Sequence, residues 1–367
     1  MKKITCAVLP LLLLVSFSVA QQAPGTWAKA GILVSAANDA YLMNDGHVFI
    51  PGSELVGTVG PQIWDPATST WSLLPAHLYG RIGSVSIVLN DGRILVTGGQ
   101  TSLNTAEIYD PFLNQWRLSA STLVVGRYFH RVTKLNDGRV LLTGGCSAYG
   151  CATAASISEI YDPVADTFTA TGSMSIVRTF HTASVLGDGR VLIAGGYTNT
   201  GTGVSRIAEI FDPATGLFTK TGNMTATRSE HTGTVMKDGR VLVTGGSTDY
   251  GAVLKSAEIY DPITGKWTRT SGMSANRYEH SAILLPDGKV MVAGGYSATR
   301  YTYIVLRLVE LFDPLTGTFS KGTPMIQPRL QFGLLQLQDG RIMAVGGDYA
   351  VIGPHKIFYG DAETYQP

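Results

Sequence analysis

The chain repeats one short phrase from one end to the other. Residues 238–246 read Asp-Gly-Arg-Val-Leu-Val-Thr-Gly-Gly, and related phrases recur at intervals of 46 to 52 residues. The Asp-Gly pairs that open them begin at Asp45, Asp91, Asp137, Asp188, Asp238, Asp287 and Asp339. Self-similarity at such a period predicts an array of small, similar units. The fold can therefore be worked out from a single unit.

The unit over 228–272 is typical of four antiparallel strands. We expect strands over 228–236, 241–246, 257–260 and 267–270, because short apolar or alternating runs are separated by turn residues. The first pair is joined by an Asp-Gly turn and the last pair by an Asp-Pro-Ile-Thr-Gly turn. No segment shows a sustained helical period. Four-stranded units at this spacing predict an all-β fold, a β-propeller.

Two aromatic columns give the number of blades. The third strands carry Trp64, Tyr109, Tyr161, Phe211, Tyr260, Phe312 and Tyr365, and the fourth strands carry Trp71, Trp116, Phe168, Phe218, Trp267 and Phe319. The missing seventh member is Trp27, because Gly25-Thr-Trp27 matches Gly265-Lys-Trp267. We therefore predict a seven-bladed propeller whose ring is closed by an N-terminal strand completing the C-terminal blade. Closure in this way protects a sheet edge.

These motifs resemble the kelch repeat. The Gly-Gly pair, the aromatic residue of Glu-Ile-Tyr-Asp-Pro and the Trp about six residues later carry the resemblance over about 24–367. It implies a propeller similar to the central domain of galactose oxidase. It does not fix a function, because kelch propellers include both enzymes and binding modules. Blade one departs most from the pattern, with Gly52-Ser53 in place of Gly-Gly.

The first twenty residues are typical of a secretory leader. Lys2 and Lys3 precede an apolar run over 7–17, and residues 18–20 offer a small-residue cleavage site. We expect a signal peptide over 1–20 and one propeller domain over 21–367. The run is too short to cross a bilayer, so no transmembrane segment is expected in the mature chain. This predicts an exported protein of bacterial type, periplasmic or extracellular, and a monomer.

Charge and cysteine content narrow the partners. The formal net charge is +1 and no basic stripe is present, so nucleic acid is not expected as a partner. Two cysteines follow the leader, Cys146 and Cys151. In an oxidising compartment a disulfide between them is expected, worth about 2 kcal/mol in the chain-entropy model. Two free thiols are the alternative.

One face of the propeller varies between units. The turns on the other face repeat Asp-Gly and Asp-Pro, whereas the loops between second and third strands range from 101–105 to 296–308 and 348–361. Binding residues concentrate in loops on a rigid scaffold. The variable face is rich in Tyr, which suits stacking on a sugar or docking on a protein. The candidate ligand-binding residues are Tyr197, Tyr250, Tyr296, Arg300, Tyr301, Tyr349 and His355.

An arginine column and a glutamate column run through blades two to seven. The arginines precede the first strands and the glutamates begin the third strands, as Arg81 with Glu107, Arg127 with Glu159, Arg178 with Glu209, Arg228 with Glu258, Arg277 with Glu310, and Arg329 with Glu363. Blade one lacks both, with Ser35 and Gln62 instead. The two strands start on the same face about 9.6 Å apart, which an arginine side chain can cross. We expect six buried ion pairs. The alternative is a ring of free guanidinium groups that binds anions at the channel mouth.

A histidine column follows three residues after the arginines in four consecutive blades, at His130, His181, His231 and His280. Copies in successive blades are spread around the ring and cannot easily converge on one metal ion. We expect buried, hydrogen-bonded structural histidines, no metal and no cofactor.

Every repeated polar residue thus has a structural interpretation, and no catalytic constellation stands out. We expect a non-catalytic binding propeller for a glycan, a cell-envelope component or a protein. The alternative is a carbohydrate-active enzyme, since kelch-like propellers include copper radical oxidases and sialic acid epimerases. The oxidase chemistry needs a Cys cross-linked to a Tyr, and the two cysteines here neighbour each other.

Overall fold

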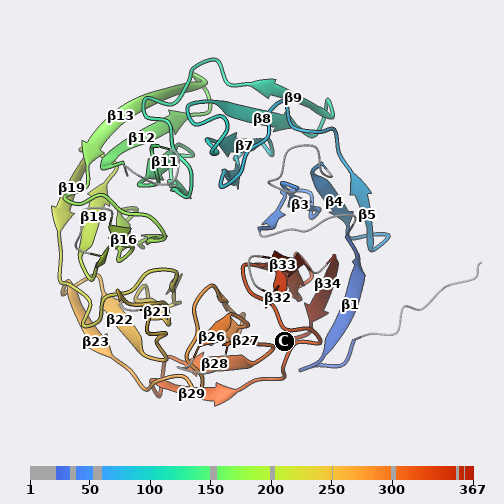
Figure 1. Cartoon of the computed structure of the whole chain (residues 1–367), viewed down its shortest axis with the longest axis vertical. Coiled ribbons are helices and arrows are strands. Elements are labelled where there is room, and N and C mark those ends of the chain that lie inside the picture. Colours follow the sequence, from blue (N-terminus) through green and yellow to red (C-terminus); the bar gives the residue numbers. More distant parts are fainter. Residues whose placement is uncertain are drawn as a thin grey trace, which may run out of the picture.

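Seven four-stranded antiparallel sheets stand around a central axis as the blades of a β-propeller (Figure 1). The computed structural model describes residues 22–33, 39–52, 60–148, 155–198, 203–249, 251–298, 303–352, 355–358 and 360–367; for 348–352 and 355–358 only the backbone is described. Every regular element among these residues is a strand. No helix in this part of the chain is long and apolar enough to cross a membrane.

The first four blades follow the chain in order. Blade one holds β2 (Tyr41–Leu42), β3 (Val48–Ile50), β4 (Gln62–Asp65) and β5 (Thr70–Leu73); blade two holds β6 (Val85–Val88), β7 (Ile94–Thr97), β8 (Ala106–Asp110) and β9 (Gln115–Leu118). Blade three holds β10 (Arg131–Lys134), β11 (Val140–Thr143), β12 (Ile157–Asp162) and β13 (Thr167–Ser173); blade four holds β14 (Thr182–Val185), β15 (Val191–Ala194), β18 (Ala208–Asp212) and β19 (Leu217–Lys220).

The last three blades complete the ring. Blade five holds β20 (Thr232–Val235), β21 (Val241–Thr244), β22 (Ala257–Asp261) and β23 (Lys266–Arg269); blade six holds β24 (Ser281–Leu284), β25 (Val290–Ala293), β28 (Val309–Asp313) and β29 (Thr318–Lys321). Blade seven joins β30 (Gly333–Gln336), β31 (Ile342–Val345), β34 (Asp361–Tyr365) and β1 (Trp27–Ile32).

The N-terminal strand closes the ring, as the aromatic columns predict. β1 pairs with β34 and places Trp27 opposite Tyr365, with ring centroids 5.2 Å apart. The same pairing of third-strand and fourth-strand aromatic rings recurs in the other blades, for instance Tyr260 with Trp267 at 5.1 Å. Figure 1 shows β1 on the outer side of β34, next to β5 of blade one. The seven-bladed all-β architecture expected from the sequence is confirmed.

The core consists of layers between neighbouring blades. The second strands β7, β11, β15, β21, β25 and β31 are buried along their whole length. One such layer joins Leu192 and Ile210 of blade four to Val241, Val243 and Tyr260 of blade five. Each blade therefore buries its apolar faces against its two neighbours, which is why the units cannot fold singly.

Two features differ from the sequence prediction. The first strand of the type unit begins at Thr232 rather than Arg228, because Glu230 has a φ of 56° and its left-handed backbone cannot continue a strand. Three loops of the variable face also form hairpins of their own. These are β16 (Tyr197–Thr198) with β17 (Gly203–Val204), β26 (Tyr296–Ala298) with β27 (Tyr303–Val305), and β32 (Asp348–Ile352) with β33 (His355–Phe358).

Candidate functional site: the mouth of the central channel

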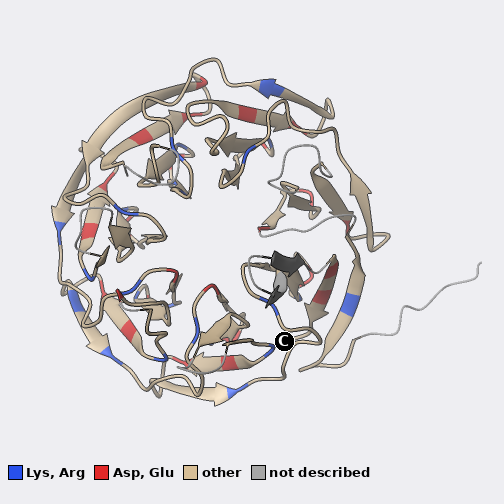
Figure 2. Ribbon diagram, viewed as in Figure 1, with Lys and Arg blue, Asp and Glu red and all other residues tan. Residues whose placement is uncertain are grey.

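Six buried ion pairs frame the variable face. Each arginine of the column contacts the glutamate of its own blade at 2.5 to 2.9 Å, and both side chains are almost completely buried. Figure 2 shows the acidic bands on the third strands of these blades, from β8 to β34. The structure thus joins the residues that the sequence couples, and the guanidinium groups are buried in the blades. They do not form the free anion-binding ring that was the alternative.

The ion pairs fasten three chain segments together. In blade five Arg228 donates to the carbonyl of Gly245 at 2.6 Å and to Glu258 at 2.7 Å. Glu258 also accepts the backbone N–H of Thr225 at 2.6 Å. Burial alone would raise the pKa of Glu258, but the Thr225 amide and the Arg228 guanidinium outweigh it and hold that pKa below its usual range. The pair therefore fixes the incoming loop to the second and third strands.

The Gly-Gly pairs allow neighbouring blades to approach closely. Gly246 donates its N–H to the carbonyl of Arg277 in the next blade at 2.8 Å. A Cβ added to Gly245 would lie 2.4 Å from that same carbonyl oxygen, and the φ of Gly245 is 61°. Only glycine fits here. The repeated glycines are therefore part of the inter-blade contact.

The histidine column also links blades. The Nε2 atom of His181 lies 2.9 Å from the hydroxyl of Thr143 in the preceding blade, and His130 and Thr97 make the same contact at 2.7 Å. Burial and the neighbouring arginines lower the pKa of His130, His181, His231 and His280 far below the usual value. These four side chains are therefore neutral at pH 7 and hold the propeller together.

Blade one replaces the ion pair with neutral groups. Gln62 occupies the glutamate position and is fully buried. Ser35, at the arginine position, lies outside the described residues. His77 lies in the loop between blades one and two, where its ring packs on Trp116 with centroids 4.2 Å apart. A buried amide is thus compatible with this position of a blade.

The residue two positions after each arginine of the column has a left-handed backbone conformation. Together these residues surround the channel mouth, and we call them the collar. Phe129, Phe180, Glu230, Glu279 and Gln331 have φ values of 48° to 56°, and Gly83 takes the equivalent place in blade two. Backbone hydrogen bonds tie neighbouring members together, including Glu279 N–H to Glu230 O at 3.1 Å and Gln331 N–H to Glu279 O at 2.9 Å. The backbone is the same at each position, while the side chain differs from blade to blade. This conformation is strained for residues other than glycine, and such strain persists at sites that need a fixed geometry.

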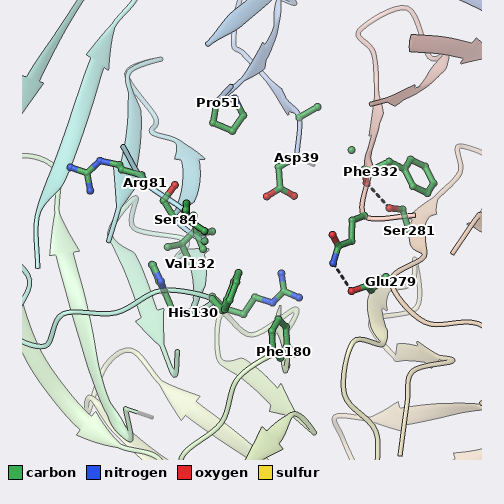
Figure 3. A pocket seen from close by; sticks show the side chains of 18 of the residues that line it. Asp39, Pro51, Arg81, Ser84, His130, Val132, Phe180, Glu279, Ser281 and Phe332 are labelled. Carbon is green, nitrogen blue, oxygen red and sulfur yellow. Dashed lines mark hydrogen bonds between the residues drawn. The ribbon is translucent and has the colours of Figure 1, made fainter. Parts of the chain in front are cut away.

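The collar opens into a cavity of about 1110 Å³ along the axis. Phe129 and Phe180 lie on one side with ring centroids 5.3 Å apart, and Glu230 and Glu279 belong to the next two blades. Figure 3 shows Phe180, Glu279 and Asp39 around the same space. Burial raises the pKa of Asp39, and the positive charge of Arg131 opposes that rise. The mouth therefore combines aromatic faces with fixed charges.

Tyrosines extend the mouth outward at blade six. Tyr278 and Tyr296 meet edge to face at 5.4 Å, and Tyr296 stacks on Tyr303 at 5.8 Å with an interplanar angle of 19°. Burial raises the pKa of Tyr278, and the carboxylates of Glu279 and Glu230 raise it further. The tyrosines and the two glutamates therefore belong to one cluster.

The structure places the predicted ligand residues as follows. Tyr197 begins β16 and is 43% exposed, and Tyr296 begins β26 within the aromatic cluster. Tyr349 belongs to β32 and His355 to β33, where only the backbone is described. The other three, Tyr250, Arg300 and Tyr301, lie outside the described residues. Cys146 is disulfide-bonded, and its expected partner Cys151 also lies outside them.

Sequence reasoning missed the collar. Its members share no chemistry, so they do not form a visible column as the arginines do. One sequence feature could have indicated the collar. Gly83 lies two residues after Arg81, and a glycine is typical of a position that needs a positive φ.

The repeated motifs agree with a known family model in two of the blades. A family model of the Kelch motif matches residues 83–122 and 229–274, which cover blade two and blade five. These two blades carry the Kelch motif, and the chain folds as a seven-bladed β-propeller. Kelch-like protein 15 of Danio rerio is 27% identical over 163 residues, which cover 38% of this chain and 26% of that protein. The chain thus spans about a quarter of the length of that relative.

Two solved structures share the fold of this propeller. A fungal alcohol oxidase of the AA5 family, in complex with copper, has a TM-score of 0.73 at 22% identity, covering 94% of this chain and 76% of its own. The protein YjhT has a TM-score of 0.60 at 14% identity, covering 80% of this chain and 95% of its own. Both similarities concern the fold alone.

Among the described residues the usual metal-ligating side chains form no cluster. No group of three His, Cys, Asp or Glu side chains among them converges on one point. The four column histidines are instead turned to threonines of neighbouring blades. Their Nε2 atoms thus serve contacts between blades.

Proposed function

We propose that this propeller is a non-catalytic binding protein that recognises its partner through the variable face, with the channel mouth at the centre of the contact. The collar carries this proposal. Its backbone is held identically in blade after blade, yet it presents Gly, Phe, Phe, Glu, Glu and Gln in turn. A scaffold that fixes position while varying side-chain chemistry is what a recognition surface requires.

The surface around the mouth supports a macromolecular partner. Tyr197 and Tyr303 are 43% and 68% exposed, and Ile304 next to Tyr303 is also exposed. Exposed tyrosines beside charged groups are typical of the contact surfaces of proteins. A glycan that stacks on the same rings is the second candidate. We further propose, from the leader-like residues 1–20, that the partner is met outside the cytoplasm.

A binding screen with matched variants tests this function. The purified protein is applied to a glycan array and used to capture partners from an extract of the source cells. Substituting Tyr197→Ala, Tyr296→Ala and Glu279→Gln together should abolish specific capture. The control changes Phe112→Ala, Ile263→Ala and Leu315→Ala on the opposite, repetitive face, where all three side chains are exposed. Capture that survives the first triple variant and disappears in the second would overturn the assignment of the face.

A further inference from the structure

Two opposite charges face the central cavity from one set of equivalent positions. The set consists of the residue that follows the histidine position in each blade, and all seven members line the cavity; we call them the channel ring. We propose that two members of this ring, Asp39 of blade one and Arg131 of blade three, together bind a small zwitterion, a molecule that carries both an ammonium group and a carboxylate. The other five members are neutral: Val85, Thr182, Thr232, Ser281 and Gly333.

The neutral polar members of the channel ring serve contacts between blades. The hydroxyl of Thr182 lies 3.2 Å from Nε2 of His231, and Ser281 donates its hydroxyl to the carbonyl of Phe332 at 2.7 Å. Both contacts join one blade to the next, so these members belong to the scaffold. The two charged members depart from that pattern, and residues that vary on a rigid scaffold are candidates for binding.

Arg131 uses only a small part of its hydrogen-bonding capacity on the scaffold. Its Nε–H donates to the carbonyl of His181 at 2.8 Å, which fixes the guanidinium against blade four. The four N–H groups on the two terminal nitrogens have no hydrogen-bond partner among the described residues, and the residue is exposed within the channel. A guanidinium held in this way can donate two parallel hydrogen bonds to a carboxylate.

Asp39 offers a carboxylate to the same cavity. Figure 3 shows this carboxylate turned into the open space, where the residue is exposed. Within the part of the chain that the structure describes, no residue donates a hydrogen bond to it or forms an ion pair with it. Asp39 and Arg131 therefore face one enclosed space without closing an ion pair across it.

Two fixed charges of opposite sign select a ligand that carries both signs. Arg131 alone would favour a simple anion and Asp39 alone a simple cation, but either ion would also meet a like charge in the same cavity. A zwitterion places its carboxylate at Arg131 and its ammonium group at Asp39, and its net charge is zero. Both contacts are stronger in an enclosed channel than on an open surface, because less water screens them.

The cavity walls favour a zwitterion with an apolar side chain. Phe129 precedes Arg131 by two residues, and its ring centroid lies 5.3 Å from that of Phe180, which also lines the cavity. The cavity of about 1110 Å³ is large enough for a free amino acid or for a short peptide with both termini charged. These two sources share one chemistry and differ in the separation of their charges.

The site goes beyond the proposed function, since it takes a small molecule inside the channel rather than a macromolecule across the variable face. Titration calorimetry with matched ligands tests it. The probes are phenylalanine, 3-phenylpropionate, which lacks the ammonium group, and phenethylamine, which lacks the carboxylate. Glycyl-phenylalanine is the fourth probe, with its two charges further apart. At least one of the two zwitterions should bind about tenfold or more tightly than either single-charge compound, because each has one charge-assisted contact more. The tighter zwitterion identifies the source.

Charge variants assign the two tasks. Arg131→Gln should weaken binding of the zwitterion and of 3-phenylpropionate by about tenfold or more, and should not weaken binding of phenethylamine. Asp39→Asn should weaken binding of the zwitterion and of phenethylamine, and should not weaken binding of 3-phenylpropionate. Arg139→Gln and Asp137→Asn are the controls, because they make the same charge changes in an exposed ion pair of the Asp-Gly turn of blade three. Neither control should change any of the four affinities.

Three results would overturn the proposal. The first is that the wild-type protein binds none of the four compounds, and the second is that it binds all four equally; both are read without any variant. The third is that the controls lose as much affinity as Arg131→Gln and Asp39→Asn. Capture of a macromolecular partner that depends on Tyr197 and Tyr296 would leave the proposed function standing in each case.

Discussion

The buried ion pair of blade five makes a quantitative prediction. Replacing Arg228 by Ala removes the contacts of its guanidinium to Glu258, to the carbonyl of Gly245 and to Ser256, while Glu258 stays buried. Stranding a buried charge in this way costs about 3–5 kcal/mol. Glu258 keeps the backbone N–H bonds of Thr225 and Ala226, so we expect the lower half of that range. Urea unfolding monitored by tryptophan fluorescence measures the cost.

A double-mutant cycle separates the pair from the rest of the site. Glu258→Gln puts a glutamine at the glutamate position of blade five. Blade one already has a glutamine at its equivalent position, Gln62, and that side chain is buried. With Arg228→Ala already present, adding Glu258→Gln should recover stability, giving a coupling of about 1.5–3 kcal/mol. Strictly additive costs, or a single-mutant cost below about 1 kcal/mol, would refute the idea that the two side chains form one unit.

Three further predictions concern the scaffold. Gly245→Ala should destabilise the protein by about 3 kcal/mol or more, because the new methyl group would lie 2.4 Å from the Arg277 carbonyl at a φ of 61°. Gly239→Ala is the control in the same unfolding assay: its φ of 83° imposes the same kind of backbone strain, but the space around it is open, so it should cost less. Trp27→Ala should lower the free energy of unfolding by about 2–4 kcal/mol, since it removes the indole that packs on Tyr365 and donates a hydrogen bond to the Thr323 carbonyl. A decrease of less than about 1 kcal/mol would contradict closure of the propeller by β1. Stability should fall as the pH is lowered below 4.5. The folded-state pKa values of Glu107 and Glu258 lie below 4.5, the ordinary value for a glutamate. The stabilisation from these two carboxylates is therefore complete above pH 4.5 and is lost as the pH falls through their folded-state pKa values. The difference in stability between wild type and Arg228→Ala should narrow as the pH falls, because the stranded Glu258 has lost the guanidinium that lowers its pKa and takes up a proton more readily; a difference that stays constant with pH would contradict this.

The sequence repeat predicts the scaffold because the same contacts are made by equivalent residues in many blades. The aromatic pairs, the Gly-Gly turns and the Arg–Glu columns each serve the same packing in blade after blade, so their spacing alone gives the blade count and the closing strand. The absence of both charges in blade one predicts the ion pairs for the same reason. A contact that is made six times leaves a pattern that one made once does not.

The residues at the channel mouth show no repeated residue type in the sequence. Phe129, Glu230 and Gln331 share a backbone conformation but no side-chain chemistry, and that conformation is set by hydrogen bonds between blades rather than by local preference. For the same reason the residue pattern predicts the start of the first strand too early, at Arg228 instead of Thr232. The stacking of Tyr296 on Tyr303 likewise depends on the β26–β27 register, in which Ala298 pairs with Tyr303. These features need the three-dimensional arrangement.

Hydroxyl-radical footprinting tests the central claim most directly, because it reports which face a partner covers even when that partner has not been identified. The protein is labelled alone and in an extract of the source cells, and the oxidation of exposed side chains is compared by mass spectrometry. We predict protection of Tyr197, Tyr303 and Ile304, with unchanged labelling of Phe112, Ile263 and Leu315 on the repetitive face. Protection of Phe112, Ile263 and Leu315 with unchanged labelling at the mouth would contradict the account.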